Sequence, residues 1–218
     1  KPPFPVEVGV FGKPTLVNNV ETLVNVLSIV KDGGAAYAAL GTEGSKGRKL
    51  FCLSGAVAKP GIYEVEFGIT LRQLIDLGGG MRGGSTMQAI LLGGAAGGFV
   101  GPNDLDLPLT MEATRAAGSS LGSGVVMVLD QSVDMVDQLR RIAAFFRDES
   151  CGQCVPCRVG TVRQEEIVSR LAKGVQSQDI ELLRELGTVM RDASICGLGQ
   201  TANSAIDSAI NKLKVFAV

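Results

Sequence analysis

The pattern of apolar and polar positions divides the chain into three parts. The first 18 residues are punctuated by Pro and Gly, and apolar residues then recur at helical spacing over residues 23–30. Asn18 and Glu21 precede this run at the spacing of an N-cap and its capping box. Gly33-Gly34 ends the pattern, so the sequence predicts one helix between Asn18 and these glycines.

The middle part has the shorter period of β-strands. Residues 49–54 and 62–67 are β-rich runs separated by a Lys-Pro-Gly turn signal at 59–61, and they predict a hairpin. Thr70 is placed to cap a short helix that follows. Two further strands are predicted, at 89–92 and 125–129. A hairpin, a helix and further strands in this order predict an α+β unit of the β-grasp type.

Beyond Asp130 the period becomes helical. Residues 133–147 carry apolar side chains at i, i+3 and i+4 spacing. Three more helices are predicted, over 159–172, 178–190 and 201–214. Four short helices with brief connections predict a four-helix bundle. The expected fold class is therefore α+β, with a β-grasp domain followed by a four-helix bundle.

Composition and charge remove several classes of function. The 218 residues carry 21 basic and 22 acidic side chains, and this balance argues against a nucleic-acid surface. No apolar run is long enough for a membrane span, so no direct membrane insertion is expected. The chain opens on Lys1–Pro5, which is no signal peptide, and it lacks an initiator Met; we expect a piece of a longer protein.

The candidate chemistry lies in the cysteines. Cys151, Cys154 and Cys157 form a C-x₂-C-x₂-C motif, Cys196 follows far along the chain, and the sequence has no His. A tight triple plus a remote cysteine suits the four corners of a [4Fe–4S] cluster, whereas structural zinc more often uses two separate pairs. Zinc ligation and unliganded thiols remain the alternatives on spacing alone. The odd cysteine count indicates a reducing compartment such as the cytoplasm.

The surroundings of the motif agree with an anionic cluster. Arg158 adds positive charge that would raise a cluster's reduction potential, and an ion pair with Asp148 or Glu149 is the alternative. Cys52, between apolar residues of the first predicted strand, is expected to be a small buried hydrophobe. Gly-rich stretches at 78–84 and 93–98 are expected to form turns, because neither stands between a strand and a helix like a phosphate-binding loop.

Residues 149–160, ESCGQCVPCRVG, closely resemble the cluster loop of the NADH-binding flavoprotein subunit of respiratory NADH dehydrogenase. The same loop occurs in relatives that serve NAD-linked formate dehydrogenases and bidirectional hydrogenases. Residues 194–199 resemble the family's fourth-ligand segment. Three more segments match the family, at 1–5, 12–22 and 121–125.

The resemblance implies a division into domains. Residues 1–38 resemble the end of an FMN- and NADH-binding domain, 39–132 a ubiquitin-like β-grasp domain of the SLBB type, and 133–218 the iron–sulfur helical bundle. The family's loops for FMN and NAD(H) lie upstream, so the resemblance puts the hydride site outside this chain. It also puts three residues near FMN: Val17, Asn18 and Asn19.

The same resemblance implies an electron-transfer role. Electrons would pass between NAD(H), FMN, the cluster and a partner's Fe–S chain, which implies a thioredoxin-like [2Fe–2S] subunit and a catalytic subunit as partners. The location implied is cytoplasmic, or peripheral at the inner face of a membrane as part of a complex. Two rival functions stay open: a zinc-stapled interaction module, and a β-grasp ligand-binding domain with incidental cysteines.

Overall fold

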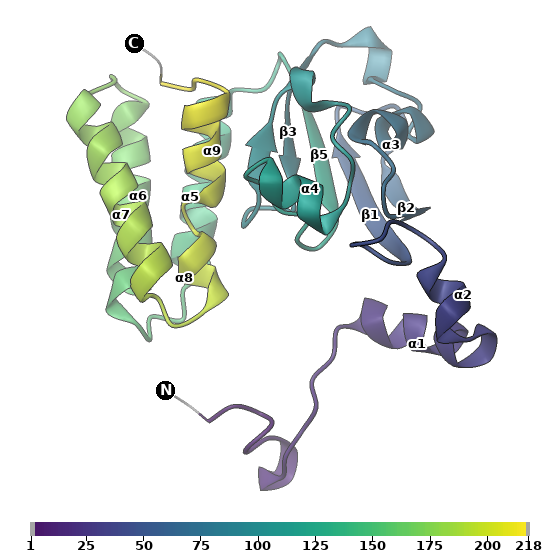
Figure 1. The fold of residues 1–218 in the computed structure, drawn as a ribbon. Helices are drawn as coiled ribbons and strands as arrows, with labels where there is room; N and C mark the ends of the chain where they lie inside the picture. Colours follow the sequence, from purple (N-terminus) through teal and green to yellow (C-terminus); the bar gives the residue numbers. More distant parts are fainter. Residues whose placement is uncertain (1–2, 217–218) are drawn as a thin grey trace.

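The computed structural model describes residues 3–216, and its centre is a five-stranded mixed sheet (Figure 1). The strand order is β2-β1-β5-β3-β4; β1 and β5 are parallel, and the other neighbours are antiparallel. The strands are β1 (Arg48–Gly55), β2 (Gly61–Glu66), β3 (Met87–Leu92), β4 (Gly98–Val100) and β5 (Val125–Asp130).

Helices precede, interrupt and follow the sheet. The α-helices are α1 (Val20–Asp32), α2 (Gly34–Ala38), α3 (Leu71–Leu77), α4 (Met111–Ala116), α5 (Met135–Glu149), α6 (Val155–Leu171), α7 (Ser177–Ala193), α8 (Gly197–Thr201) and α9 (Ser204–Lys212). Short 3₁₀ turns occur at Val10–Gly12, Arg82–Gly84 and Pro102–Asp104. Within residues 3–216, none of the helices combines the length and apolar character needed to cross a membrane.

The elements predicted for the middle part are present. The hairpin forms as β1 and β2, and Thr70 caps α3, where its side chain and that of Gln73 complete a capping box. The Gly-rich stretches at 78–84 and 93–98 connect α3 to β3 and β3 to β4, as turns. The sequence analysis missed β4 and α4, which are too short to show a period.

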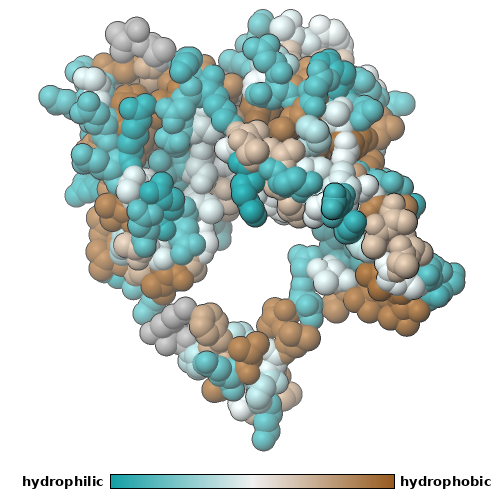
Figure 2. Space-filling view, viewed as in Figure 1, coloured by the Kyte–Doolittle hydropathy of each residue, from teal (hydrophilic) through white to brown (hydrophobic). Residues whose placement is uncertain are grey.

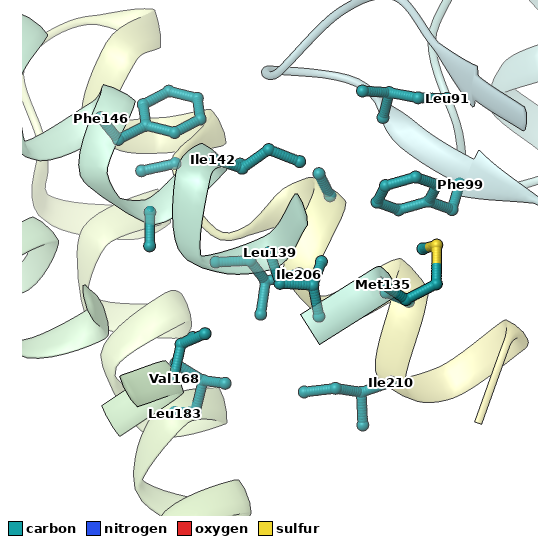
Figure 3. Close-up of a cluster of buried hydrophobic side chains, with 14 of the residues drawn as sticks. Leu91, Phe99, Met135, Leu139, Ile142, Phe146, Val168, Leu183, Ile206 and Ile210 are labelled. Carbon is teal, nitrogen blue, oxygen red and sulfur yellow. The ribbon is translucent and has the colours of Figure 1, made fainter. Parts of the chain in front are cut away.

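Both faces of the sheet are covered on the β3–β4 side. On one face, Leu71 and Leu74 of α3 pack with residues such as Phe51 of β1 in one apolar cluster. On the other face, Leu91 of β3 and Phe99 of β4 pack against the C-terminal helices (Figure 3). These helices, α5 to α9, are called the bundle below. The bundle side of this second cluster includes Met135, Leu139, Ile142, Ile206 and Ile210. The bundle is therefore packed onto the sheet rather than tethered beside it.

A buried hydrogen bond joins the edge strand β4 to the bundle. The backbone N–H of Phe99 donates to Ser208 Oγ of α9 at 2.7 Å, and the Ser208 hydroxyl donates in turn to the Ala205 carbonyl. An edge strand otherwise leaves such N–H groups open to pairing with another chain. Helix α9 thus covers this edge of the sheet with both apolar and polar contacts.

The starts of two predicted helices of the bundle differ most from the prediction. The last predicted helix, 201–214, forms as α9 from Ser204, and the separate short helix α8 precedes it across Ala202-Asn203. Helix α6 begins at Val155, before the predicted start at 159, because Pro156 occupies its first turn. Proline is favoured there, since its missing N–H would have no helical partner. Cys157 therefore lies inside a helix and not in the preceding loop.

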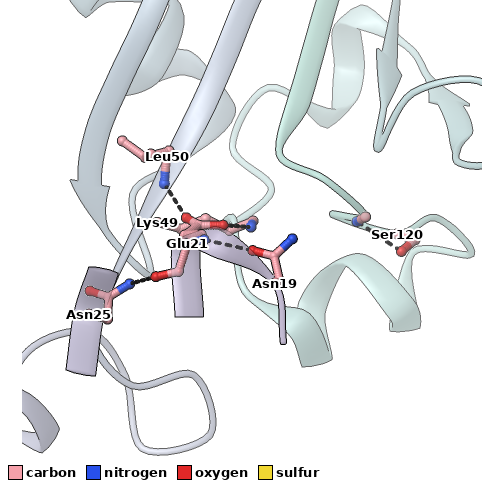
Figure 4. A network of polar contacts seen from close by, with 7 residues as sticks. Asn19, Glu21, Asn25, Lys49, Leu50 and Ser120 are labelled. Atoms are coloured by element: carbon pink, nitrogen blue, oxygen red, sulfur yellow. Dashed lines mark hydrogen bonds and ion pairs between the residues drawn. The ribbon is translucent and has the colours of Figure 1, made fainter. Parts of the chain in front are cut away.

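The start of α1 differs from the prediction. Asn19, not Asn18, is the N-cap, and its side chain accepts from the Glu21 N–H at 2.8 Å. The Glu21 carboxylate does not complete a capping box; it accepts from the Leu50 N–H at 2.8 Å and from Lys49 Nζ at 3.1 Å (Figure 4). The Lys49 side chain is only 9% exposed, so Glu21 pairs with a nearly buried charge on β1.

The N-terminal part and one face of β1 expose apolar side chains. Helix α1 buries no residue, and the segment that carries it extends away from the sheet, with brown apolar atoms along it in Figure 2. Cys52 is exposed, so the expectation of a buried cysteine is wrong. The reason is the two-residue period of β1: Phe51 and Leu53 face the core, and Cys52 faces the opposite side, where no helix covers it.

Glu21→Gln tests whether the ion pair holds α1 against the sheet. The variant leaves the Lys49 ammonium without its charged partner, so the opening free energy of α1 should fall by about 1–2 kcal/mol at pH 7. Hydrogen exchange of the α1 amides measures this change. Glu185→Gln alters an exposed carboxylate on α7 and should leave α1 unchanged.

The difference between the variant and the parent should also depend on pH. Burial alone would raise the pKa of Glu21, but the Leu50 N–H and the Lys49 ammonium outweigh it and hold this pKa below the ordinary 4.5. Such a carboxylate stabilises the native state above its unfolded pKa, and the effect is lost as pH falls through the lowered pKa. The two proteins should therefore converge at acid pH. A difference that stayed constant would mean that shape, not charge, holds α1.

Candidate metal centre

The four cysteines selected from the sequence converge on one cavity. Its volume is about 370 Å³, and Cys151, Cys154, Cys157 and Cys196 all line it. The first two lie in the connection from α5 to α6, Cys157 lies in the first turn of α6, and Cys196 lies between α7 and α8. Figure 1 shows α8 at the lower end of the bundle, on the side toward which the N-terminal segment extends.

Close packing of α6 against α7 brings the two cysteine segments together. Gly160 of α6 faces Met190 of α7, and a Cβ on Gly160 would lie 2.5 Å from the Met190 Cγ. Real Cβ atoms do not come so close, so a glycine is needed at this crossing. Because α7 returns alongside α6, its C-terminal end and Cys196 arrive at the start of α6.

The loop before α6 is shaped by its own residues. Gly152 has φ +73°, a backbone conformation that glycine adopts without strain. Arg158 Nη1 donates to the Gly152 carbonyl at 2.7 Å and so ties the loop to the first turn of α6. Cys154 is the N-cap residue of α6, so it lies at the end of the helix where the N–H groups have no helical partner.

The thiols have unequal surroundings. The N–H of Ile195, followed by that of Cys157, holds the pKa of the Cys154 thiol below its usual value. Burial raises the pKa of Cys157, whose side chain is 5% exposed, and a hydrogen bond from Ser150 opposes that rise. Charges on the other three cysteines raise the pKa of Cys157 further, because all four lie close together.

The donor set fits an iron–sulfur cluster better than one metal ion. All four ligands on offer are soft sulfurs, which favour Fe–S clusters or zinc. A single zinc ion needs four sulfurs at about 2.3 Å from one point. The four sulfurs here line a cavity of about 370 Å³. A cluster with an iron at each corner suits sulfurs spread around a larger cavity.

The position of Arg158 agrees better with a positive charge beside the cysteine site than with an ion pair to Asp148 or Glu149. Its guanidinium donates to the Gly152 carbonyl, one residue from Cys151, so its positive charge lies at the cysteine loop. The described ion pairs link Asp148 to Arg147 instead, and Arg147 also pairs with Glu165. Cys52 does not line the cavity and lies on β1.

The residues expected near FMN lie in the N-terminal segment. Val17 and Asn18 precede α1 outside any helix or strand, and Asn19 caps the helix. Val17 is 72% exposed, and none of the three lines the cysteine cavity.

Sequence reasoning missed two serines at the cysteine segments. Ser150 Oγ lies 3.2 Å from Cys157 Sγ, and Ser194 is buried beside Gly199. Each serine stands within two residues of a motif cysteine, so their positions in the sequence could have drawn attention to them. Spacing alone does not show which way a hydroxyl points.

Comparisons with known proteins agree with this site. The family described as "NADH-ubiquinone oxidoreductase-F iron-sulfur binding region" matches residues 137–215, which include all four cavity cysteines. The SLBB domain family matches residues 50–100, in the sheet. Both assignments were expected from the resemblance of the sequence motifs.

Whole-chain relatives come from two kinds of oxidoreductase. "NADP-reducing hydrogenase subunit HndC" of Solidesulfovibrio fructosivorans is 40% identical over 213 residues, which are 97% of this chain and 44% of that protein. The NADH-quinone oxidoreductase F subunit of Mycobacterium bovis is 40% identical over 215 residues, 98% of this chain and 48% of that protein. The chain thus spans about half the length of the curated relatives it matches.

A solved structure of a hydrogenase has the same fold over nearly the whole of this chain. A chain in the crystal structure of an NAD⁺-reducing [NiFe]-hydrogenase in the H₂-reduced state superposes with a TM-score of 0.88 and 39% identity. The match covers 99% of this chain and 37% of that one. This chain therefore carries an SLBB region and the iron–sulfur binding region of the F type, and over nearly its whole length it is similar to the C-terminal part of NADH-quinone oxidoreductase F subunits and of a hydrogenase subunit.

Proposed function

We propose that this chain is the electron-transfer part of an NADH:acceptor oxidoreductase flavoprotein subunit. In this proposal Cys151, Cys154, Cys157 and Cys196 bind the irons of a [4Fe–4S] cluster. The observation that carries it is the convergence of these four sulfurs on one cavity, from segments on both sides of α6 and α7. When bound, a [4Fe–4S] cluster supplies one-electron transfer.

The protein's own groups would set the properties of that site. Each cysteine sulfur would bind one iron, and the N–H groups of Ile195 and Cys157 favour the charged form of Cys154. Arg158 holds the loop through Gly152 and supplies positive charge. Ile195 and Leu198 line the cavity, and the exposed Val155 follows Cys154, so the site has apolar side chains at its edge that limit water around the sulfurs.

The fold supports three regions with distinct roles. We assign 39–132 to a ubiquitin-like β-grasp domain, because the order β2-β1-β5-β3-β4 with parallel central strands β1 and β5 and α3 on one face suits that fold. We assign 133–218 to the iron–sulfur bundle and 1–38 to the end of an FMN- and NADH-binding domain. The apolar surface of α1, which buries no residue, supports the last assignment.

The rest of the activity would belong to the full-length subunit and its complex. We propose that FMN and NAD(H) bind mainly outside this chain, with Val17, Asn18 and Asn19 contributing contacts to FMN. The relatives named above are subunits of an NADH-quinone oxidoreductase and of hydrogenases, so partner subunits with their own Fe–S centres would take electrons from the cluster or supply them. A thioredoxin-like [2Fe–2S] subunit and a catalytic subunit are the partners we propose, in the cytoplasm or at the inner face of a membrane.

Metal analysis and cysteine substitution test the proposed cluster. Protein purified without oxygen should be brown and contain about four irons and four sulfides per chain, the composition of a cubane. Replacing any one of Cys151, Cys154, Cys157 and Cys196 with Ala should lose the intact cluster. Cys52→Ala should keep it and change the free energy of unfolding by less than about 0.5 kcal/mol, because Cys52 is exposed.

Two results would contradict the cluster proposal. One is stoichiometric zinc without iron, in protein made with ample iron and without oxygen, which would favour a zinc-stapled module. The other is retention of a complete cubane after Cys196→Ala, which would remove the proposed fourth ligand.

NADH oxidation tests the division of labour between this chain and the rest of the protein. We expect no NADH oxidation by the 218-residue chain when FMN and the acceptor ferricyanide are supplied. A hydride site needs a nicotinamide stacked on a flavin in a fixed pocket, and in our proposal that pocket lies mainly outside this chain. The chain should still accept an electron from dithionite. A longer protein that adds the upstream half found in the relatives should restore NADH-dependent ferricyanide reduction.

A full-length variant that lacks the cluster separates the two steps. Cys196→Ala in the longer protein should retain hydride transfer to FMN while losing electron transfer beyond it. Robust NADH oxidation by the short chain alone, with contaminating diaphorase removed, would place the hydride site within residues 1–218.

A further inference from the structure

Ser150 makes a direct contact with a cavity cysteine. Its Oγ lies 3.2 Å from Cys157 Sγ, within hydrogen-bond distance for a sulfur acceptor. The Gly152 N–H donates to the same Oγ at 3.3 Å, so the oxygen already serves as an acceptor. An iron-bound cysteine sulfur carries no proton. In the cluster-bound state, the Ser150 O–H is therefore the donor and Cys157 Sγ the acceptor.

Ser194 is a second hydroxyl at the site, from the other cysteine segment. It is 6% exposed, and its Oγ is buried with no hydrogen-bond partner of standard geometry within residues 3–216. Gly199 leaves room for this hydroxyl, because a Cβ on Gly199 would lie 2.3 Å from Ser194 Oγ. The same Cβ would lie 2.9 Å from the Cβ of Cys157, so the Ser194 hydroxyl lies at the cysteine site.

A buried hydroxyl without a partner is costly, so the site must supply an acceptor. The Ile195 N–H and the Ser194 hydroxyl are both among the groups that lower the pKa of the Cys154 thiol, which puts this sulfur close to residue 194. A deprotonated, iron-bound sulfur accepts hydrogen bonds more strongly than a neutral thiol. Binding of a cluster would therefore give Ser194 the acceptor that it lacks.

We propose that the hydroxyls of Ser150 and Ser194 donate hydrogen bonds to the iron-bound sulfurs of Cys157 and Cys154 and thereby raise the reduction potential of the cluster. This inference rests on the proposed [4Fe–4S] ligation. It adds two positioning residues whose action reaches the cluster through its ligands.

The direction of the effect follows from charge. Reduction adds one electron to the cluster and its four thiolates, with no bond made or broken and no proton taken up. The added negative charge is shared by the sulfurs, so a hydroxyl that donates to a sulfur stabilises the reduced state more than the oxidised state. Removing either donor should therefore make the potential more negative.

The test compares Ser150→Ala and Ser194→Ala with the parent chain, all purified without oxygen. Dithionite supplies the electrons in a titration with redox mediators, and EPR follows the reduced cluster. Each variant should keep the parent's iron and sulfide content but show a more negative midpoint potential. The double variant should show roughly the sum of both shifts, because the hydroxyls act on different sulfurs. Ser204→Ala, at an exposed serine of α9 outside the cavity, should leave the potential unchanged.

Two further measurements distinguish a hydrogen bond from a structural role. Ser150→Thr keeps the hydroxyl, and it should bring the potential back toward that of the parent. ENDOR spectra of the reduced parent in H₂O and D₂O should show exchangeable protons near the cluster that weaken in each alanine variant.

The outcomes separate this inference from the proposed function. A parent chain that assembles no cubane would overturn the proposed function and this inference with it. Intact clusters with unchanged potentials in both alanine variants would overturn the inference alone. Loss of the cluster in Ser194→Ala would assign Ser194 a structural role and overturn the proposed hydrogen bond from Ser194 to Cys154. The Ser150→Ala and Ser150→Thr variants would still decide the proposed hydrogen bond from Ser150 to Cys157.

Discussion

The close contact between α6 and α7 is the constraint on which the rest of the site depends. Because Gly160 has no side chain, Met190 can pack against the α6 backbone, and Met190 is completely buried. This contact sets the distance between the start of α6 and the end of α7. Cys154 and Cys157 lie at the first of these ends and Cys196 follows the second, so interhelical packing determines how far apart the sulfurs are. The connection from α5 into α6 carries three of the four cysteines, and the helix pair sets where their sulfurs lie relative to Cys196.

The bundle is in turn positioned by the sheet. Phe99 contributes its ring to the shared apolar cluster and its N–H to Ser208, so one strand residue joins β4 to α9 in two ways. Helix α5, which leads directly to the cysteine loop, belongs to the same cluster. Motion of the bundle against the sheet would therefore open a continuous core. A site for electron transfer gains from this rigidity, since its distances to donor and acceptor stay constant.

The sequence predicted the elements with a strong period, and its cysteine spacing predicted that four cysteines come together at one site. The hairpin, α3, α5 and the four cysteines belong to this group. It could not predict features that depend on distant neighbours. Strand β4 has three residues, and its partner Ser208 lies more than a hundred positions away. The carboxylate of Glu21 was assigned to its own helix because capping is a local rule, yet Lys49 on β1 competes for it and binds it. The expectation that Cys52 is buried was wrong for a local reason. Side chains alternate along β1, so a buried Phe51 already places Cys52 on the opposite, exposed face.

The unequal surroundings of the four sulfurs follow from the same helix ends. Cys154 lies at the N-cap of α6, where nearby N–H groups favour its negative charge, whereas Cys157, in the first turn of the helix, is buried with few donors. Ser150 Oγ lies 3.2 Å from Cys157 Sγ, so Ser150 is placed to donate to this sulfur once it is deprotonated. Because the potential of a cluster depends on the sum of such donors, the bounds of α6 are an electronic property of the site as well as a structural one. A helix that began at 159, as its apolar period alone indicated, would leave both sulfurs in a loop without these fixed N–H groups.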